Sequence, residues 1–136
     1  MSAIVVVDAS ALAAIAFREP EGRAMLDRLN GRELVAPRLL AYELANTALT
    51  KIRRHPSEAN AIRVGLDGVL SDEMAIYWSD VAHDKVLALA EQTGLTAYDA
   101  AYLWLAQYLG ADLVTLDTRL QRAFDRRPGP APRSPE

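Results

Sequence analysis

Short apolar segments alternate with helical segments along this chain of 136 residues, and that alternation restricts the fold to few possibilities. Strands are predicted at residues 3–7, 33–37, 74–78 and 112–116, because each segment is short and mostly apolar. The first and last of them are apolar on both faces, which is typical of parallel strands covered by helices on both sides. The pattern therefore predicts an α/β fold around a short, mainly parallel central sheet.

Predicted helices fill the intervals between the strands, at residues 9–17, 20–30, 38–54, 57–70, 80–92, 96–109 and 118–125. The longest of them ends at His55–Pro56, because proline removes a hydrogen-bond donor and clashes with a continuing helix. Gly65 and Gly68 weaken the prediction for the helix that contains them. Four prolines among the last nine residues predict a disordered tail at 128–136, which leaves one domain at 1–127.

The composition excludes several classes of protein. The chain has no cysteine, so disulfides and thiolate metal sites are ruled out. No apolar run is long enough to cross a bilayer, and the first residues lack the basic start and long apolar stretch of a signal peptide. We therefore expect a cytoplasmic protein that does not associate with membranes. The net charge of −3 does not by itself indicate a nucleic-acid-binding protein.

Two of the four predicted strands end on an aspartate. Asp8 follows IVVV, and Asp117 follows LVTL. Each could cap the next helix, since an aspartate in that position accepts hydrogen bonds from unpaired amides. In open α/β sheets, however, binding sites form beyond the carboxyl ends of the strands. Asp8 and Asp117 are therefore candidates for one shared site as well as for two helix caps.

Two further carboxylates lie on predicted helices. Asp99 stands three residues after Thr96, a spacing typical of a capping box, and its charge suits the positive end of the helix. Glu43 shares one side of its helix with Asn46 and Thr47. A solvated helix face normally carries lysine, arginine, glutamate and glutamine, so these short polar side chains favour the wall of a groove.

Carboxylates that meet at one edge of a sheet repel each other. At an effective dielectric constant of about 20, two unit charges about 4 Å apart cost about 4 kcal/mol. A divalent cation or a shared proton relieves this repulsion. Oxygen ligands without histidine or cysteine favour Mg²⁺ or Mn²⁺ over zinc. The usual role of such a cation is to gather phosphate oxygens and to activate a water for in-line attack.

The order of these acids resembles the PIN domain and, more narrowly, the VapC-type toxins of toxin–antitoxin systems. The resemblance rests on DAS at 8–10, YDAAY at 98–102 and TLD at 115–117, with Glu43 on a helix between the first two. Each motif is weak alone, but in this order and at this length they are specific together. The resemblance spans residues 3 to about 125 and leaves out the proline-rich tail.

The resemblance implies a three-layer α/β/α sandwich and an endoribonuclease that depends on Mg²⁺ or Mn²⁺. It assigns an acidic, catalytic and metal-binding pocket to the four matching residues Asp8, Glu43, Asp99 and Asp117. Those matching Asp8 and Asp99 are the usual direct ligands of the family. It gives supporting roles, such as orienting a carboxylate or a metal-bound water, to Ser10, Thr115 and Asn46.

The mechanism that the resemblance implies is hydrolysis of RNA by a metal-activated water. Because water attacks and not the 2′-hydroxyl, the expected products carry a 5′-phosphate and a 3′-hydroxyl. The family also implies a VapB-like antitoxin, which would place a basic side chain among the carboxylates, and commonly a homodimer. An acidic pocket favours a cationic occupant on physical grounds as well.

Flanking cations must guide a polyanion toward an acidic pocket. Arg119 and Arg122 follow Asp117 and are the preferred candidates for substrate binding, with the cluster at 51–54 as the alternative. Either cluster could equally be a solvated helix end. Three tyrosines, at 42, 98 and 102, could stack on bases, but their helical spacing beside apolar residues favours the core.

Two rival interpretations stay open at this point. A receiver-like domain also gathers aspartates and Mg²⁺ at strand ends, but it needs a lysine after a late strand. Lys51 and Lys85 both lie in predicted helices. A non-catalytic module would use the carboxylates only as helix caps. One metal ion and two are equally compatible with four carboxylates, and no motif identifies the RNA.

Overall fold

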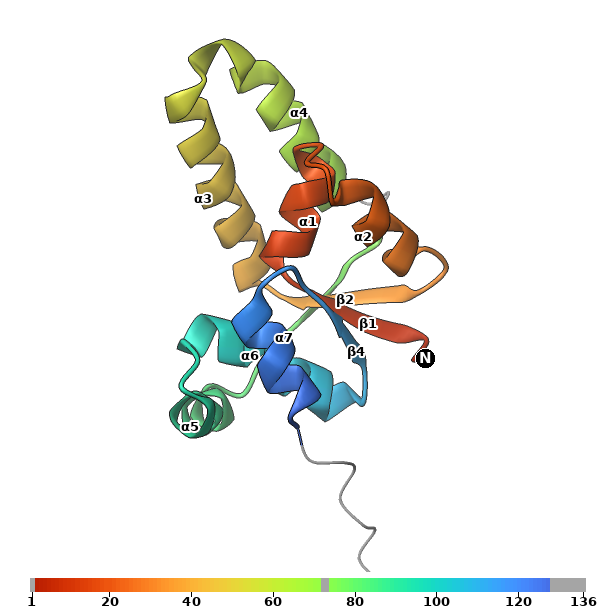
Figure 1. Cartoon of the computed structure of the whole chain (residues 1–136), viewed down its shortest axis with the longest axis vertical. Coiled ribbons are helices and arrows are strands. Elements are labelled where there is room, and N and C mark those ends of the chain that lie inside the picture. The colour runs from red at the N-terminus through yellow and green to blue at the C-terminus, as the bar shows by residue number, and fades with distance from the viewer. Residues whose placement is uncertain (1, 72–73, 128–136) are drawn as a thin grey trace, which may run out of the picture.

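The computed structural model describes residues 2–71 and 74–127 (Figure 1). Its sheet contains four strands in the order β3-β2-β1-β4, and each neighbouring pair is parallel. The strands are β1 (Ile4–Val7), β2 (Glu33–Pro37), β3 (Tyr77–Ser79) and β4 (Asp112–Val114). The predicted parallel α/β class is therefore confirmed, with β1 in the interior of the sheet and β3 and β4 at its edges.

Helices cover both faces of the sheet. The first group packs together on one side and comprises α1 (Ala9–Ala16), α2 (Gly22–Leu29), α3 (Leu39–Arg54) and α4 (Ala59–Leu70) (Figure 1). The second group lies on the other side and comprises α5 (His83–Thr93), α6 (Ala97–Leu109) and α7 (Thr118–Asp125) (Figure 1). A short 3₁₀ turn, Pro56–Glu58, joins α3 to α4. The three-layer α/β/α arrangement is confirmed.

The core lies where the central strand meets the two innermost helices. Val5, Val6 and Val7 are fully buried, as an apolar run covered on both faces requires. Leu12 of α1 and Leu103 of α6 are buried as well, and both helices belong to the same apolar cluster as the strand. The end of β1 is therefore held between the two helical layers, so the residue that follows it has little freedom to move.

Two strands differ from their predicted ranges by more than one residue. The third was expected at 74–78 but begins at Tyr77, because Ala75 adopts a left-handed backbone conformation with φ +51° that no strand continues through. The fourth was expected to reach residue 116 but ends at Val114. There the Thr115 hydroxyl accepts a hydrogen bond from the Asp117 amide at 2.9 Å, which turns the chain out of the sheet.

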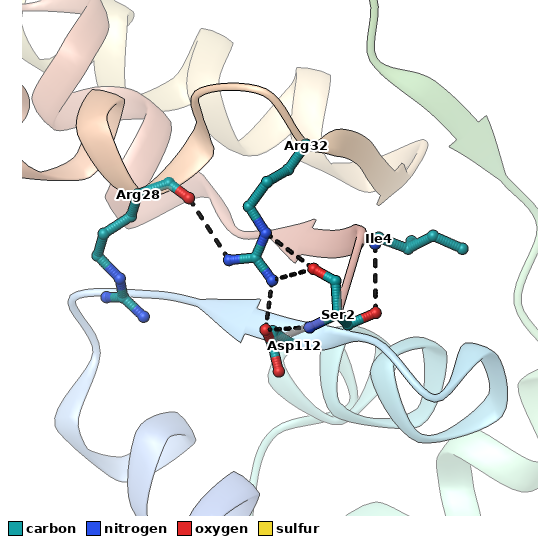
Figure 2. Close-up of polar contacts among 5 residues, drawn as sticks. All are labelled: Ser2, Ile4, Arg28, Arg32 and Asp112. Atoms are coloured by element: carbon teal, nitrogen blue, oxygen red, sulfur yellow. Dashed lines mark hydrogen bonds and ion pairs between the residues drawn. The ribbon is translucent and has the colours of Figure 1, made fainter.

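An arginine fastens the amino end of the sheet, opposite the edge where the predicted site lies. Figure 2 shows the Arg32 guanidinium between the Ser2 carbonyl oxygen, which it contacts at 2.6 and 3.0 Å, and the Asp112 carboxylate. The same carboxylate accepts the Ser2 amide at 3.1 Å. These contacts tie the starts of β1, β2 and β4 together. The register that results brings the carboxyl ends of β1 and β4 side by side.

The predicted tail at 128–136 lies outside the described residues. Within 2–71 and 74–127, no helix combines the length and apolar character needed to cross a membrane.

Candidate acidic site

Asp8 is the centre of the candidate site. It follows β1 directly and is buried, with only 5% of its surface exposed. One carboxylate oxygen accepts the Ala11 amide at 3.1 Å, so Asp8 does cap α1 as the simpler interpretation held. The same oxygen accepts the Ser10 hydroxyl at 2.7 Å, and the other oxygen accepts the Thr115 hydroxyl. A helix cap needs only the first of these contacts, so the two hydroxyls indicate a further role.

Ser10 and Thr115 connect the ends of β1 and β4. Their hydroxyl oxygens lie 3.2 Å apart, and the Ser10 hydroxyl also accepts the Leu116 amide at 2.9 Å. Because Thr115 also receives the Asp117 amide, the network runs from the first strand to the N-terminus of α7. The structure therefore places Ser10 and Thr115 against Asp8, where they fix the orientation of its carboxylate.

Glu43 lies on α3 and is held by a tyrosine from the other helical layer. The Tyr102 hydroxyl donates a hydrogen bond to Oε1 of Glu43 at 2.5 Å. Tyr102 itself is 1% exposed, so its ring is core and its hydroxyl reaches the site. The sequence pattern predicted the buried ring, but nothing in it indicated this contact, which spans 59 residues.

Asp99 and Asp117 both stand at helix N-termini. Asp117 caps α7 by accepting the Leu120 amide at 3.0 Å. Thr96 caps α6 by accepting the Asp99 amide at 3.1 Å, as the predicted capping box requires. One oxygen of the Asp117 carboxylate therefore already accepts a hydrogen bond from the helix. Asp99 takes part in its cap through its backbone amide, so its half-buried carboxylate is not used by the cap.

The four acids share one electrostatic environment. Burial raises the pKa of Asp8 against the lowering effect of its hydrogen bonds, and the charge of Asp117 raises it further. Burial is also the first cause of the raised pKa of Glu43, to which the charges of Asp99 and Asp8 add. Burial and then the charge of Asp117 raise the pKa of Asp99. Each of the four therefore takes part in at least one of these repulsions, as expected of acids gathered at one sheet edge.

A groove with a volume of about 970 Å³ opens beside these acids. Ser10, Glu43 and Asn46 line it, which agrees with the groove wall predicted for that face of α3. Glu19 and Glu21, from the connection between α1 and α2, line it too and were missed. No motif distinguishes them in the sequence. They reach the groove only because α2 folds back along α1.

The expectation that the three tyrosines at 42, 98 and 102 belong to the core is wrong for two of them. Tyr42 is 77% exposed and Tyr98 is 67% exposed, and both line the groove. Only Tyr102 of the three is buried. The helical spacing identified one face correctly for Tyr102 but could not show that the neighbouring turns of α3 and α6 face solvent here.

The two basic clusters lie in different surroundings. Lys51 forms an ion pair with Glu19 at 3.3 Å, so its charge is already engaged at the groove. Arg119 donates to the Gly94 carbonyl oxygen at 3.0 Å, and its charge partly offsets the burial and the Asp117 charge that raise the pKa of Asp99. Arg122 is exposed one turn further along α7. Arg119 is therefore the member of the α7 cluster that acts on one of the acids.

The chemistry of the donors fits a hard divalent cation. Within 2–71 and 74–127, no group of three or more carboxylate, histidine or cysteine side chains is arranged closely enough to hold a metal ion as it stands. The oxygens are nevertheless of the type that Mg²⁺ and Mn²⁺ take. Burial, and after it repulsion between the acids, raises the pKa of Asp8, Glu43 and Asp99, and a cation would offset both effects.

Removing the Tyr102 hydroxyl tests whether its hydrogen bond positions the Glu43 carboxylate. Tyr102→Phe keeps the buried ring but leaves the half-buried Glu43 without its donor, and we expect any activity of the site to fall by about tenfold or more. Tyr108→Phe is the matched control, because Tyr108 is on the same helix but 72% exposed. Equal rates for the two variants, measured under identical conditions, would show that the contact does not position Glu43.

Comparisons with known proteins bear on the family and the fold. The PIN-domain family profile matches residues 5–125. Ribonuclease VapC3 of Pyrobaculum aerophilum is 35% identical over 123 residues, which cover 88% of this chain and 93% of that protein. Exonuclease VapC9 of the same organism is 36% identical, over 84% of this chain and 80% of that protein.

A solved structure shows the same fold. The crystal structure of PAE2754 from Pyrobaculum aerophilum superposes with a TM-score of 0.72 at 30% sequence identity. The match covers 89% of this chain and 85% of that one.

Proposed function

The chain belongs to the PIN-domain family and to its VapC type, and from this membership we propose that it is a metal-dependent endoribonuclease, the toxin of a toxin–antitoxin pair. The observation that carries the proposal is the environment of Asp8. A buried carboxylate at the joint of β1 and β4, oriented by two hydroxyls and raised in pKa by burial and by Asp117, is costly for a structural cap alone.

The four carboxylates Asp8, Glu43, Asp99 and Asp117 would hold the cation, with Asp8 and Asp99 as direct ligands. Glu43 and Asp117 would complete the site directly or through a bound water. A bound Mg²⁺ or Mn²⁺ supplies Lewis-acid stabilisation of phosphate charge and a more acidic water. Ser10 and Thr115 keep the Asp8 carboxylate in one orientation. Asn46 lines the groove where the RNA strand would lie.

Glu43 is the residue best placed to move the proton. Its pKa is raised, chiefly by burial, and a raised pKa makes a carboxylate a stronger base. The Tyr102 hydroxyl occupies Oε1, so Oε2 is the oxygen that would accept the proton from the attacking water. Attack by water, and not by the 2′-hydroxyl, gives a 5′-phosphate and a 3′-hydroxyl.

The partners proposed follow from the same site. RNA would enter the groove, with Arg119 and Arg122 countering the repulsion of the acids. A VapB-like antitoxin would inhibit by placing a cationic segment among the carboxylates, for which the extra acids Glu19 and Glu21 add attraction. A homodimer and a cytoplasmic location complete the proposal.

The rival non-catalytic function draws support from two observations. Asp8 and Asp117 do cap helices, by accepting the amides of Ala11 and Leu120. It does not account for the hydroxyls on Asp8 or for Tyr102 on Glu43. The receiver-like alternative has less support, because Lys85 lies on α5 and Lys51 on α3, where it pairs with Glu19.

Circular RNA provides the test, because only an endonuclease can open it. The purified protein is incubated with linear and circular single-stranded RNA in Mg²⁺, in Mn²⁺ and in a chelator, and the product ends are mapped. We expect both substrates to be cut, only with metal, and to yield 5′-phosphates. Cleavage of linear RNA alone would indicate an exonuclease. Cyclic 2′,3′-phosphate ends, or cutting in the chelator, would overturn the mechanism.

A further inference from the structure

A second, smaller cavity lies between the end of α5 and the exposed face of α7, apart from the groove. Its volume is about 450 Å³. Gln92, Thr93 and Leu95 line it on the side of α5. Three arginines also line it: Arg119, Arg122 and Arg126. None of the described residues that line it is acidic. The cavity therefore gathers three positive charges between two helices.

The three arginines share one face of α7, opposite the buried Leu120 and Phe124. Like charges at this spacing destabilise a helix. The helix dipole favours Arg122 and Arg126 near the C-terminus, but it disfavours Arg119 in the first turn. Within 2–71 and 74–127, none of the three lies within ion-pair distance of a carboxylate. Helix stability does not explain their arrangement.

Arg119 links this cavity to the acidic site. Its guanidinium is fixed by the Gly94 carbonyl oxygen at the end of α5. Its charge also acts on Asp99, and Asp117, the N-cap of α7, stands two residues before it. A chain of phosphates that reached the acids could therefore continue along α7 into the cavity.

We propose that this cavity binds a backbone phosphate of the RNA strand next to the one that is cleaved, an inference that rests on the proposed function. A guanidinium offers parallel N–H donors that match phosphate oxygens, and cavities with several arginines suit that anion. The acids repel a polyanion, so an anchor beside them must supply the attraction. Arg122 and Arg126 hold the phosphate, and Arg119 stands between the anchor and Asp99.

The first test is binding without cleavage. Arg122→Gln/Arg126→Gln and the control Arg53→Gln/Arg54→Gln, which removes the same charge from the exposed end of α3, are compared with the parent protein. Fluorescence anisotropy with a single-stranded oligoribonucleotide in chelator gives each affinity. We expect about tenfold weaker binding for the α7 variant and a salt slope reduced by about 0.7 for each lost contact. The control should change little.

The second test locates the phosphate. Methylphosphonate linkages, which remove one charge, are placed singly along the oligonucleotide. We expect one position to weaken binding by the parent protein and by the α3 control but not by the α7 variant. Equal responses of all three proteins at every position would overturn the phosphate site. Binding of polyglutamate by the same proteins is measured as well. If the α7 variant lost affinity for polyglutamate but bound RNA as the parent does, the phosphate site would be overturned and the cavity would be assigned to an acidic protein segment.

The outcomes separate this inference from the proposed function. If the parent binds RNA with the predicted position dependence but never cuts it with metal present, the nuclease proposal fails and the phosphate site stands. If it cuts RNA and the α7 variant binds as the parent does, only the phosphate site fails. A parent that binds no RNA overturns the site directly.

Discussion

Replacing Asp99 with asparagine should reduce RNA cleavage by about a thousandfold while the protein stays folded. Asparagine keeps the shape and the backbone amide that Thr96 accepts, so the N-terminus of α6 is undisturbed. What it removes is a negative charge that repels those of Asp117 and Glu43. Gel-based cleavage of a labelled RNA in Mg²⁺ measures the loss, and circular dichroism reports the fold.

The same change should make the metal-free protein slightly more stable. The folded-state pKa of Asp99 is raised above its ordinary value of 3.8, by burial and by the charge of Asp117. The stability that this group contributes is therefore complete below about pH 4 and is lost as pH rises through the raised pKa. At neutral pH the ionised form is a cost that asparagine lacks. Because Asp99 is only half-buried, we expect a gain of about 1–3 °C in Tm.

Asp84→Asn is the matched control, since Asp84 lies in the first turn of α5 and is exposed. It should leave cleavage unchanged and should not raise the stability, because an exposed acid in the first turn of a helix is favourable. Cleavage by Asp99→Asn at the parental rate would remove Asp99 from the site. A lower Tm for the metal-free Asp99→Asn protein would show that repulsion is not what its charge contributes.

The second large effect is on stability and comes from one glycine. Gly65 of α4 packs against the end of α1, and a methyl group added there would collide with the carbonyl oxygen of Ala16. That oxygen belongs to the backbone of α1, so it cannot turn away as a side chain could. We expect Gly65→Ala to lower the free energy of unfolding by about 2 kcal/mol, because overpacking outweighs the better helix propensity of alanine.

Gly68 is one turn away on the same helix and provides the control. A methyl group added there meets nothing within 4 Å. Gly68→Ala should therefore stabilise the protein by up to about 1 kcal/mol through helix propensity alone. Urea unfolding of both variants gives the two values. If both substitutions stabilise, then α4 does not press against α1 as closely as the structure indicates.

The parts of the fold that depend on local sequence patterns could be predicted. A run such as IVVV is buried on both faces only in a covered parallel sheet, so β1 and the class followed from it. Because parallel strands bring their carboxyl ends to one edge, the sequence alone predicts that Asp8 and Asp117 lie together. The motif around Asp99 and the polar face of α3 extended the prediction to the helices.

The remainder depends on contacts that a local pattern does not carry. The sequence predicts only that Gly65 weakens its own helix. Nothing near it in sequence indicates that it packs against the backbone of α1. The Tyr102–Glu43 hydrogen bond joins two helical layers. Glu19 and Glu21 reach the groove through the fold of α2 alone, and the late start of β3 depends on the conformation of Ala75.

Calorimetric titration with Mn²⁺ tests most directly whether these acids gather to hold a hard cation. The parent protein should bind the ion and, at about 100 times its Kd, gain about 2.7 kcal/mol of stability. Asp8→Asn should retain the fold and lose most of the binding, while Asp84→Asn should bind as the parent does. A parent that takes up no Mn²⁺, or an Asp8→Asn variant that binds it equally well, would contradict the account.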